Sequence, residues 1–295
     1  MNINFGEVLT AMVTPFNSNL EVDIDMVRDL AAYLVDENGS DGLVILGTTS
    51  EVPTLSEDEK LSILENVVDE VGDRATIVAG TGSYSTSKSI QLTQKAEKIG
   101  VDGIMLVVPY YNKPPQDGLY NHFKLIASQT KLPIMLYNVP SRTSRNLEAK
   151  TVGRLAKIDN ICAVKEASGD LPQVAEIARI TSEDFYIYSG DDNLTLPILS
   201  VGGQGVVSVA SHLIGNKIKN MISAFKQGDV QKAAVLNNKL FPVFNGIFVN
   251  TNPIPVKAAL RMSGKNVGHC RPPLSKLAKK EKEKLQTVLK QTELI

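Results

Sequence analysis

Residues 42–82 read GLVILGTTSEVPTLSEDEKLSILENVVDEVGDRATIVAGTG, two short apolar runs with a helical pattern between them. The runs GLVILG and TIVAG lack the polar–apolar alternation of a half-exposed strand, and continuous apolar runs are typical of parallel strands covered on both faces. Between them, Ser56 and Glu59 have the spacing of a capping box, which predicts the start of a helix. The residues expected on its buried face are Leu61, Leu64, Val68 and Val71. The segment therefore predicts a strand, a helix and a second strand.

The same alternation of apolar runs and helical patterns extends along most of the chain. The runs are VLTAMVTPF from Val8, GLVILGTT from Gly42, TIVAGTG from Thr76, GIMLVVPYY from Gly103, PIMLYNVP from Pro133, ICAVKEA from Ile161, YIYSGDD from Tyr186 and GVVSVAS from Gly205. Eight such runs, most of them followed by a helix, predict a TIM-type (β/α)8 barrel over residues 1–228. A doubly wound open sheet is the competing topology, but no glycine-rich dinucleotide or phosphate loop follows a strand. Residues 229–295 are predicted to form a C-terminal helical appendage, suited to packing or assembly rather than to catalysis.

The composition of the 295-residue chain is that of a globular protein, with 43% hydrophobic residues and a formal net charge of -1. This balance, with no basic run outside the tail KLAKKEKEKLQTVLK, argues against a nucleic-acid partner. The tail has leucines at helical spacing and is expected to form a solvated amphipathic helix. No apolar run is long enough to span a bilayer, and the N-terminus lacks a signal-peptide pattern. Cys162 and Cys270 form no disulfide framework, so a cytoplasmic protein without a membrane partner is expected.

The sixth apolar run ends in ICAVKEASGD, residues 161–170, and it places Lys165 at the far end of a buried strand. Active sites of (β/α)8 barrels collect at these strand ends. Burial lowers the pKa of a lysine, and its neutral amine can then attack a carbonyl and form an imine. Tyr137, at the end of the neighbouring strand, is suitably placed to carry the proton. The alternative is an ion pair between Lys165 and Glu166, although adjacent strand residues point to opposite faces.

Two further strand ends carry groups that suit small carboxylates. The hydroxyls and backbone N–H groups of Thr48 and Thr49 could hold one carboxylate, and the fork of Arg142 could hold another. Taken singly, Tyr137 is more often a core residue, Arg142 a solvated cation and the threonine pair a turn. Their coincidence at the strand ends of one barrel favours an imine-forming lyase or aldolase.

Other chemistries find little support in the sequence. The three histidines, His122, His212 and His269, lie on different predicted elements without ligand spacing, and His212 is expected to be a hydrogen-bonded histidine. The pair Asp191-Asp192 is expected to cap the following helix rather than to hold a cation. No GxSxG elbow is present, so a serine hydrolase is not indicated. No metal site is expected.

An ordered set of motifs resembles the dihydrodipicolinate synthase family over essentially the whole chain. The motifs are TPF, GTTSE, AGTG, PYYNKP, GLYNHF, LYNVPSRT, VKEASGD, SGDD, GGQGVVSV and NPIPVK. The resemblance implies the condensation of pyruvate with L-aspartate 4-semialdehyde in diaminopimelate and lysine biosynthesis. It also implies that no cofactor is needed beyond the covalent imine with pyruvate.

The same resemblance implies the roles of four catalytic residues. Lys165 corresponds to the Schiff-base lysine, and Tyr137 to the proton-transferring tyrosine, linked through Thr48 to Tyr111. In the family, the residue matching Tyr111 reaches into the active site of the neighbouring subunit. A homo-oligomer is therefore expected, with a homotetramer built as a dimer of dimers as the family's usual form.

Substrate-binding positions follow from the resemblance as well. Thr49 is expected to take the pyruvate carboxylate and Arg142 the semialdehyde carboxylate, while Gly190 and Val207 border the pyruvate. N-acetylneuraminate lyase and 2-keto-3-deoxy sugar-acid aldolases share the lysine and tyrosine and remain alternatives, but the arginine of YNVPSRT favours the synthase. A catalytically silent barrel that acts as a binding protein is a third alternative.

Two departures from the family pattern carry expectations of their own. Ser50 stands where the family commonly has glycine, and a modest change of the turn is expected. Several residues also differ at the positions that match the lysine-inhibition pocket of feedback-sensitive relatives. These positions are Pro53, Glu57, Lys60, Tyr84 and Lys88, with Tyr110 retained. The added cations should repel an ammonium ligand, so weak or absent inhibition by lysine is expected.

Overall fold

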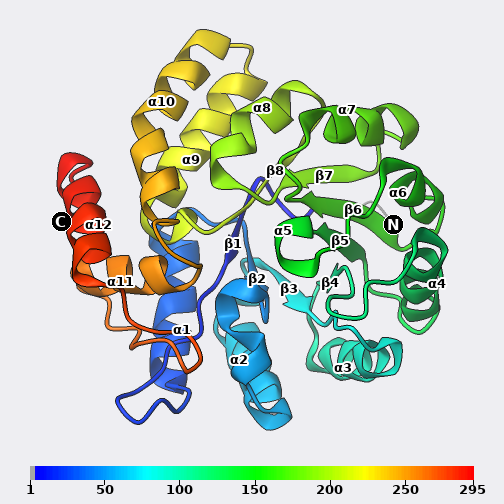
Figure 1. The fold of residues 1–295 in the computed structure, drawn as a ribbon, viewed down its shortest axis with the longest axis horizontal. Helices are drawn as coiled ribbons and strands as arrows, with labels where there is room; N and C mark the ends of the chain where they lie inside the picture. The colour runs from blue at the N-terminus through cyan, green and yellow to red at the C-terminus, as the bar shows by residue number, and fades with distance from the viewer. Residues whose placement is uncertain (1–3) are drawn as a thin grey trace.

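Eight parallel strands close into a barrel in chain order in the structure, a computed structural model that describes residues 4–295. The strands are β1 (Val8–Ala11), β2 (Gly42–Ile45), β3 (Thr76–Gly80), β4 (Gly103–Val107), β5 (Ile134–Asn138), β6 (Ile161–Glu166), β7 (Tyr186–Ser189) and β8 (Gly205–Ser208). The predicted (β/α)8 barrel is confirmed (Figure 1). Residues 1–3, which belong to the predicted barrel region and to the N-terminus expected to lack a signal peptide, lie outside the described residues.

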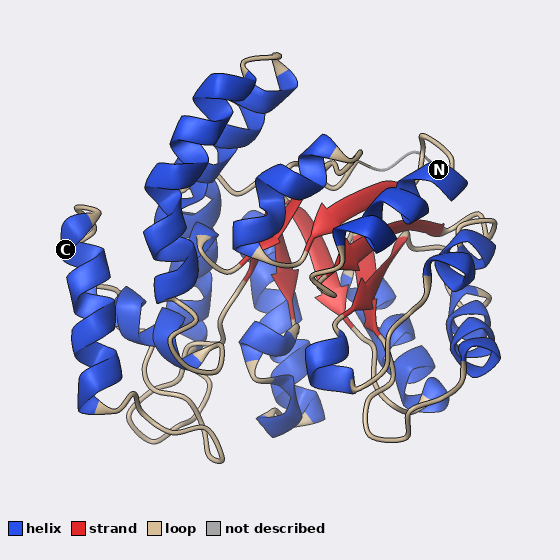
Figure 2. Ribbon diagram, turned by 45° about the horizontal axis from the view of Figure 1, so that its top comes forward, coloured by secondary structure: helices blue, strands red, loops and turns tan. Residues whose placement is uncertain are grey.

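Helices surround the strands on the outside of the barrel (Figure 2). They are α1 (Ile24–Ala32), α2 (Glu57–Val71), α3 (Thr86–Ile99), α4 (Gln116–Ala127), α6 (Ala149–Leu155), α7 (Leu171–Ile180), α8 (Thr195–Ser200) and α9 (Ser211–Lys226). The short helix α5 (Pro140–Thr143) lies over the strand ends instead (Figure 1). Short turns of other helix types are η1 (Tyr33–Glu37), η2 (Thr48–Ser50), η3 (Val52–Thr54) and η4 (Asp192–Leu194). The turns η2 and η4 follow β2 and β7 directly, at the ends of the strands where the sequence placed candidate site residues.

The predicted capping box of α2 is present, with Ser56 and Glu59 bonding each other's backbone N–H groups. The predicted buried face is partly wrong. Its buried residues are Ile63, Leu64, Val67 and Val71. Leu61 and Val68 are only half-buried. The apolar stripe of α2 is wider than one helix face, and only the side that packs on the strands is fully buried.

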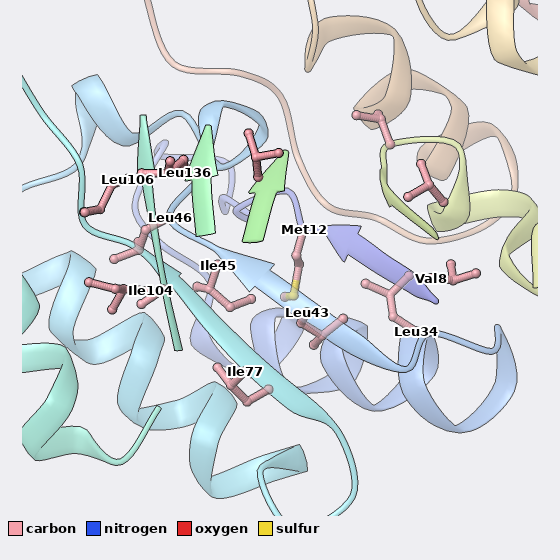
Figure 3. Packing of buried hydrophobic residues seen from close by; sticks show 14 of the residues in the cluster. Val8, Met12, Leu34, Leu43, Ile45, Leu46, Ile77, Ile104, Leu106 and Leu136 are labelled. Carbon is pink, nitrogen blue, oxygen red and sulfur yellow. The ribbon is translucent and has the colours of Figure 1, made fainter. Parts of the chain in front are cut away.

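The core has two layers, as barrel geometry requires. The outer layer lies between strands and helices, and Figure 3 shows Leu43, Ile45 and Ile77 within it. The inner layer fills the barrel with side chains that alternate with the outer ones along each strand. Met135 and Tyr137 of β5 belong to this inner layer, together with residues from the other strands.

Three helices follow the barrel: α10 (Val230–Gly246), α11 (Ile254–Met262) and α12 (Lys279–Gln291). α10 packs beside α9, and α12 lies at the edge of the molecule farthest from the barrel axis (Figure 1). Leu285 and Leu289 of α12 pack on Ala258 and Ala259, which confirms the amphipathic helix predicted in the tail. The division of the chain at residue 228 into two regions stays a prediction. Among residues 4–295, no helix has the length and apolar character needed to cross a membrane.

Candidate active site

Lys165 and Tyr137 lie side by side inside the barrel. The two residues are paired in register between β5 and β6, so both side chains point to the same face of the sheet. The ammonium nitrogen of Lys165 is 4.3 Å from the centre of the Tyr137 ring, and each residue is only 5% exposed. Among the described residues, Lys165 takes part in no ion pair, and Glu166 points to the other face. The alternative of a Lys165–Glu166 ion pair is therefore wrong.

Burial lowers the pKa of Lys165 to about 8. The carboxylates of Asp191 and Asp192 act in the opposite direction, and the charge of Arg142 lowers the pKa of Lys165 further. An amine with this pKa is neutral in about a tenth of the molecules at pH 7, far more than an ordinary exposed lysine. It is therefore available as a nucleophile without a separate base.

Tyr137 is a phenol that stays protonated over the working pH range. Burial raises its pKa to about 12, while a hydrogen bond with the Thr48 hydroxyl acts in the opposite direction. Thr48 begins η2, the turn that follows β2, so the threonine and the tyrosine come from two different strand ends. A phenol held in this way can donate and accept a proton over a short distance.

Thr49 is buried beside a residue from the C-terminal region. The side-chain amide of Asn252 donates to the Thr49 hydroxyl oxygen at 2.9 Å. Arg142, in the short helix α5, is exposed and directs one guanidinium nitrogen to the backbone oxygen of Asn252 at 3.4 Å. The two predicted carboxylate-binding residues are thus connected through Asn252.

Gly190 and Val207 lie on the side of Lys165 away from β5. A Cβ atom at position 190 would come within 2.6 Å of the Ala167 side chain and 3.2 Å of Cε of Lys165, so only glycine fits. Val207 is fully buried in the inner layer of the barrel. Gly190 is therefore placed against the lysine, and Val207 is placed in the interior of the same barrel.

A cavity of about 310 Å³ opens at the ends of strands β2 to β5. Its wall includes Thr48, Tyr110, Tyr137 and Arg142, together with Asn252. Lys165, Thr49, Gly190 and Val207 are not part of that wall. Tyr137 thus belongs both to the cavity and to the contact with Lys165.

Tyr111 is the predicted site residue that this chain does not bring to the others. It is 92% exposed and has a left-handed backbone with φ 69°. Its neighbour Tyr110 instead turns inward, where it lines the cavity and makes an edge-to-face contact with Tyr84. The Tyr111 side chain projects from the surface of the molecule.

The turn after β2 is held by bonds that reach far along the chain. The Ser50 hydroxyl donates to the Met12 carbonyl at 2.7 Å, and Thr14 donates to the Ser50 carbonyl at 2.8 Å. Glu51 has a left-handed backbone with φ 58° and forms a fully buried ion pair with Lys257 of α11, at 2.9 Å. The side chain of Ser50 therefore ties the turn to the loop after β1, which a glycine could not do.

The remaining candidates have structural partners. His212 accepts a hydrogen bond from the backbone N–H of Val13 and lies 2.9 Å from the Val209 carbonyl, as expected of a buried, hydrogen-bonded histidine. The expectation that Asp191 and Asp192 cap the following helix is wrong. Asp191 stands at the N-cap of η4 but makes no side-chain capping bond there, and Asp192 is bonded elsewhere. Its carboxylate turns toward the end of β8 and accepts from the N–H groups of Val209 and Ala210. Those N–H groups are buried and need an acceptor. No group of metal-ligating side chains occurs within residues 4–295.

A protein-family model matches nearly the whole length of this chain. The model of the "Dihydrodipicolinate synthetase family" matches residues 4–292. The chain belongs to this family. The family resemblance and the lyase class predicted from the sequence are thereby confirmed.

Three relatives of this dihydrodipicolinate synthetase family member illustrate the similarity. A curated 4-hydroxy-tetrahydrodipicolinate synthase from Desulforudis audaxviator is 58% identical over 295 residues, 100% of each chain. The crystal structure of a dihydrodipicolinate synthase from Bacillus anthracis is 49% identical, covers 98% of both chains and has a TM-score of 0.95. That of the Cyanidioschyzon merolae enzyme, with lysine bound, is 47% identical, covers 99% of both chains and has a TM-score of 0.97.

Two groups near the site were not found from the sequence. Asn252 stands 203 positions from Thr49, and nothing in NPIPVK indicated a contact with the threonine. The electrostatic influence of Asp191 and Asp192 on Lys165 was also missed. The motif SGDD, at the end of the strand next to Lys165, was the available signal for it.

Proposed function

We propose that this chain is a 4-hydroxy-tetrahydrodipicolinate synthase, which condenses pyruvate with L-aspartate 4-semialdehyde. The observation that carries the proposal is the buried Lys165, with a pKa lowered to about 8, against the ring of Tyr137 in a member of this family. Both the nucleophile and the proton carrier that imine chemistry requires are present at one pair of strand ends.

The proposed reaction starts at the amine of Lys165. The neutral amine attacks the keto carbon of pyruvate, and loss of one water leaves a protonated imine. The imine nitrogen then serves as the electron sink, so the methyl carbon loses a proton and an enamine forms. No resident metal or organic cofactor enters the proposed reaction.

The second half of the reaction joins the two substrates. The enamine carbon attacks the aldehyde carbon of the semialdehyde, and the new oxyanion takes a proton to become a hydroxyl. The amino group of the semialdehyde then attacks the imine carbon, closes the ring and releases Lys165 as the free amine. Tyr137, hydrogen-bonded to Thr48, is the proposed carrier of protons between these steps.

The carboxylates of the substrates are assigned to the strand-two turn and to α5. Thr49 and the backbone of its turn would hold the pyruvate carboxylate, while Gly190 and Val207 shape the space beside Lys165. Arg142 would hold the semialdehyde carboxylate at the mouth of the cavity, where its guanidinium is exposed. A sugar-acid aldolase would need hydroxyl partners and room at that position instead.

Assembly and location are part of the same proposal. Since Tyr111 is exposed on its own chain, we propose that it completes the Thr48–Tyr137 relay of a second copy. The active form would then be at least a dimer and, as the family usually shows, a homotetramer made of two dimers. We further propose that the enzyme works in the cytoplasm.

A reduction experiment tests the imine directly. Incubation with pyruvate and borohydride should add one reduced pyruvate to Lys165, which peptide mass spectrometry can locate. The buried Lys257 serves as an internal control and should stay unmodified, because it is engaged by Glu51. The variant Lys165→Arg keeps the positive charge and should form no adduct.

Turnover then separates the remaining alternatives. In a separate assay without borohydride, the enzyme is expected to consume L-aspartate 4-semialdehyde, which is followed with the downstream reductase. An adduct without consumption of the semialdehyde would indicate another pyruvate-dependent aldolase. The absence of any adduct on the wild-type chain would indicate a catalytically silent barrel.

A further inference from the structure

A buried carboxylate without a cation lies directly behind the lysine–tyrosine pair. Glu166 follows Lys165 on β6 and points out of the barrel, and it takes part in none of the ion pairs formed by residues 4–295. Its two oxygens accept hydrogen bonds only from neutral groups. These are the Asn138 amide at 3.0 and 3.1 Å, the Ser168 backbone N–H at 2.8 Å and the Gln173 amide at 3.1 Å.

Burial and hydrogen bonding act in opposite directions on the carboxyl group of Glu166. Burial raises its pKa and is the larger effect, while hydrogen bonds from Ser168, Asn138 and Gln173 lower it. These partners stabilise the ionised form. Hydrogen bonds to a charged group are about twice as strong as neutral ones and fix the geometry of their donors.

Asn138 is the partner that connects this carboxylate to the second reacting strand. It follows Tyr137 on β5 and is paired in register with Glu166, just as Tyr137 is paired with Lys165. Its amide nitrogen also donates to Asn146 at 2.8 Å, and its carbonyl oxygen accepts from the N–H of Leu147 at 2.9 Å. Since Asn138 is fully buried, its side chain has one orientation that satisfies all these groups.

We infer that Asn138 and Glu166 are positioning residues that set how Tyr137 and Lys165 face each other. The inference rests on the proposed function, in which these two side chains exchange protons with one bound substrate. Each member of the outer pair is the chain neighbour of a member of the inner pair. A change in the separation of Asn138 and Glu166 is therefore transmitted to the inner pair through a single peptide unit.

A second contact connects the Asn138–Glu166 pair to β7. The backbone oxygen of Glu166 accepts from the N–H of Gly190 at 2.7 Å, and Gly190 lies against Lys165. Three consecutive strands are thus joined at the level of the reacting amine. Misplacement of reacting groups by about 1 Å can lower rates by about 100-fold. Loss of these contacts should therefore produce a measurable fall in the reaction rate.

The test uses two substitutions that exchange the chemical groups. Asn138→Asp alone puts two carboxyl groups against each other. Whether they repel as anions or share one proton, the contact between the Asn138 amide and Glu166 is lost and the spacing of the strands should change. In the double variant N138D/E166Q, the carboxylate and the amide change places, and the pair can form again. The amides of Asn146 and Gln173 can turn over to suit the reversed polarity, because each offers both a carbonyl and an NH2 group.

The readout is exchange of the pyruvate methyl protons with deuterium in D2O, followed by NMR without the second substrate. This exchange requires the imine of Lys165 and a correctly placed proton carrier. We expect N138D to slow exchange by about 100-fold, and N138D/E166Q to return to within about tenfold of the wild type. In a Tyr137→Phe background, N138D should add only a few-fold loss, since the residue it positions is already altered.

A matched control separates positioning from loss of fold. Asn160 lies at the opposite end of the barrel, just before β6, and donates to the carbonyls of Ala127 and Thr130. Asn160→Asp should lower the melting temperature while the folded protein keeps its exchange rate. Equal exchange rates in N138D and the wild type would refute the inference, as would losses that only follow the melting temperature. A wild-type chain that neither exchanges nor forms the adduct would instead refute the proposed function.

Discussion

Lys165 shows how a single residue obtains its reactivity from the place where the strand puts it. An exposed lysine is almost fully charged at neutral pH and makes a poor nucleophile. Inside the barrel, burial disfavours the charged form, and the two aspartates after β7 limit how far the pKa of Lys165 falls. The result is an amine that can be neutral at the moment of attack and protonated afterwards.

The lowered pKa gives a specific pH dependence. Because the neutral amine is the reactive form, imine formation should increase about tenfold per pH unit below about 8 and level off above it. The rate of adduct formation with pyruvate, with reductant in excess, measures this directly. The Tyr137 phenol, with its pKa raised to about 12, should not affect the profile.

A substitution of one aspartate provides the control. Asp191→Asn removes the carboxylate that raises the pKa of Lys165 most, so the midpoint of the profile should move to lower pH. A wild-type rate that continues to rise up to about pH 10 would show that Lys165 behaves as an ordinary exposed lysine.

At the scale of the element, α2 and α3 surround Glu57 with three lysines. Lys95 pairs with Glu57, and the charges of Lys60 and Lys88 also lower the pKa of its carboxyl group. Burial and the charge of Lys88 both lower the pKa of Lys60. A ligand that carries an ammonium group would have to approach against these cations.

We therefore expect free lysine to inhibit this enzyme weakly or not at all. Steady-state rates measured with added L-lysine should stay unchanged at low millimolar concentrations. Lys88→Glu reverses one of the charges and should increase the response to lysine. Clear inhibition of the wild type in that range would contradict the expectation.

The elements also show what the sequence can and cannot predict. The eight strands and the start of α2 were predicted correctly, because apolar runs and the Ser56–Glu59 capping box act over a few residues. The roles of Asn252 and Lys257 depend on contacts across more than 200 residues, and no local pattern encodes such a contact. The buried face of α2 was partly misassigned. Its apolar stripe is wide, and the neighbouring elements determine which side of the stripe is buried.

At the scale of the whole molecule, the proposal that the exposed Tyr111 serves a second copy can be tested. Tyr111→Phe should lower turnover while the borohydride adduct on Lys165 still forms, since the hydroxyl serves proton transfer rather than imine formation. Sedimentation measurements should show a dimer or a larger assembly at working concentrations. Unchanged turnover in the variant would contradict the proposed relay.

Mixed assemblies identify the chain in which Tyr111 acts. A dimer of one Tyr111→Phe chain and one Lys165→Arg chain contains one site with both an intact lysine and an intact tyrosine from the partner. Mixing the two weakly active variants under conditions of subunit exchange should therefore restore part of the turnover. If Tyr111 served its own chain, the mixture would stay as inactive as its components.

The ion pair between Glu51 and Lys257 has a consequence for the order in which the protein is made. The threonine turn leaves the ribosome early, whereas the lysine that neutralises the adjoining carboxylate follows 206 residues later. In the complete fold, leaving one member of such a buried pair alone costs about 3–5 kcal/mol, so the buried position of Glu51 depends on Lys257. A chain that contains all eight strands but not α11 would lack this partner for the turn around Thr48 and Thr49. We therefore expect a chain that ends before α11 to hold pyruvate poorly, because the turn that carries Thr48 and Thr49 would lack this support.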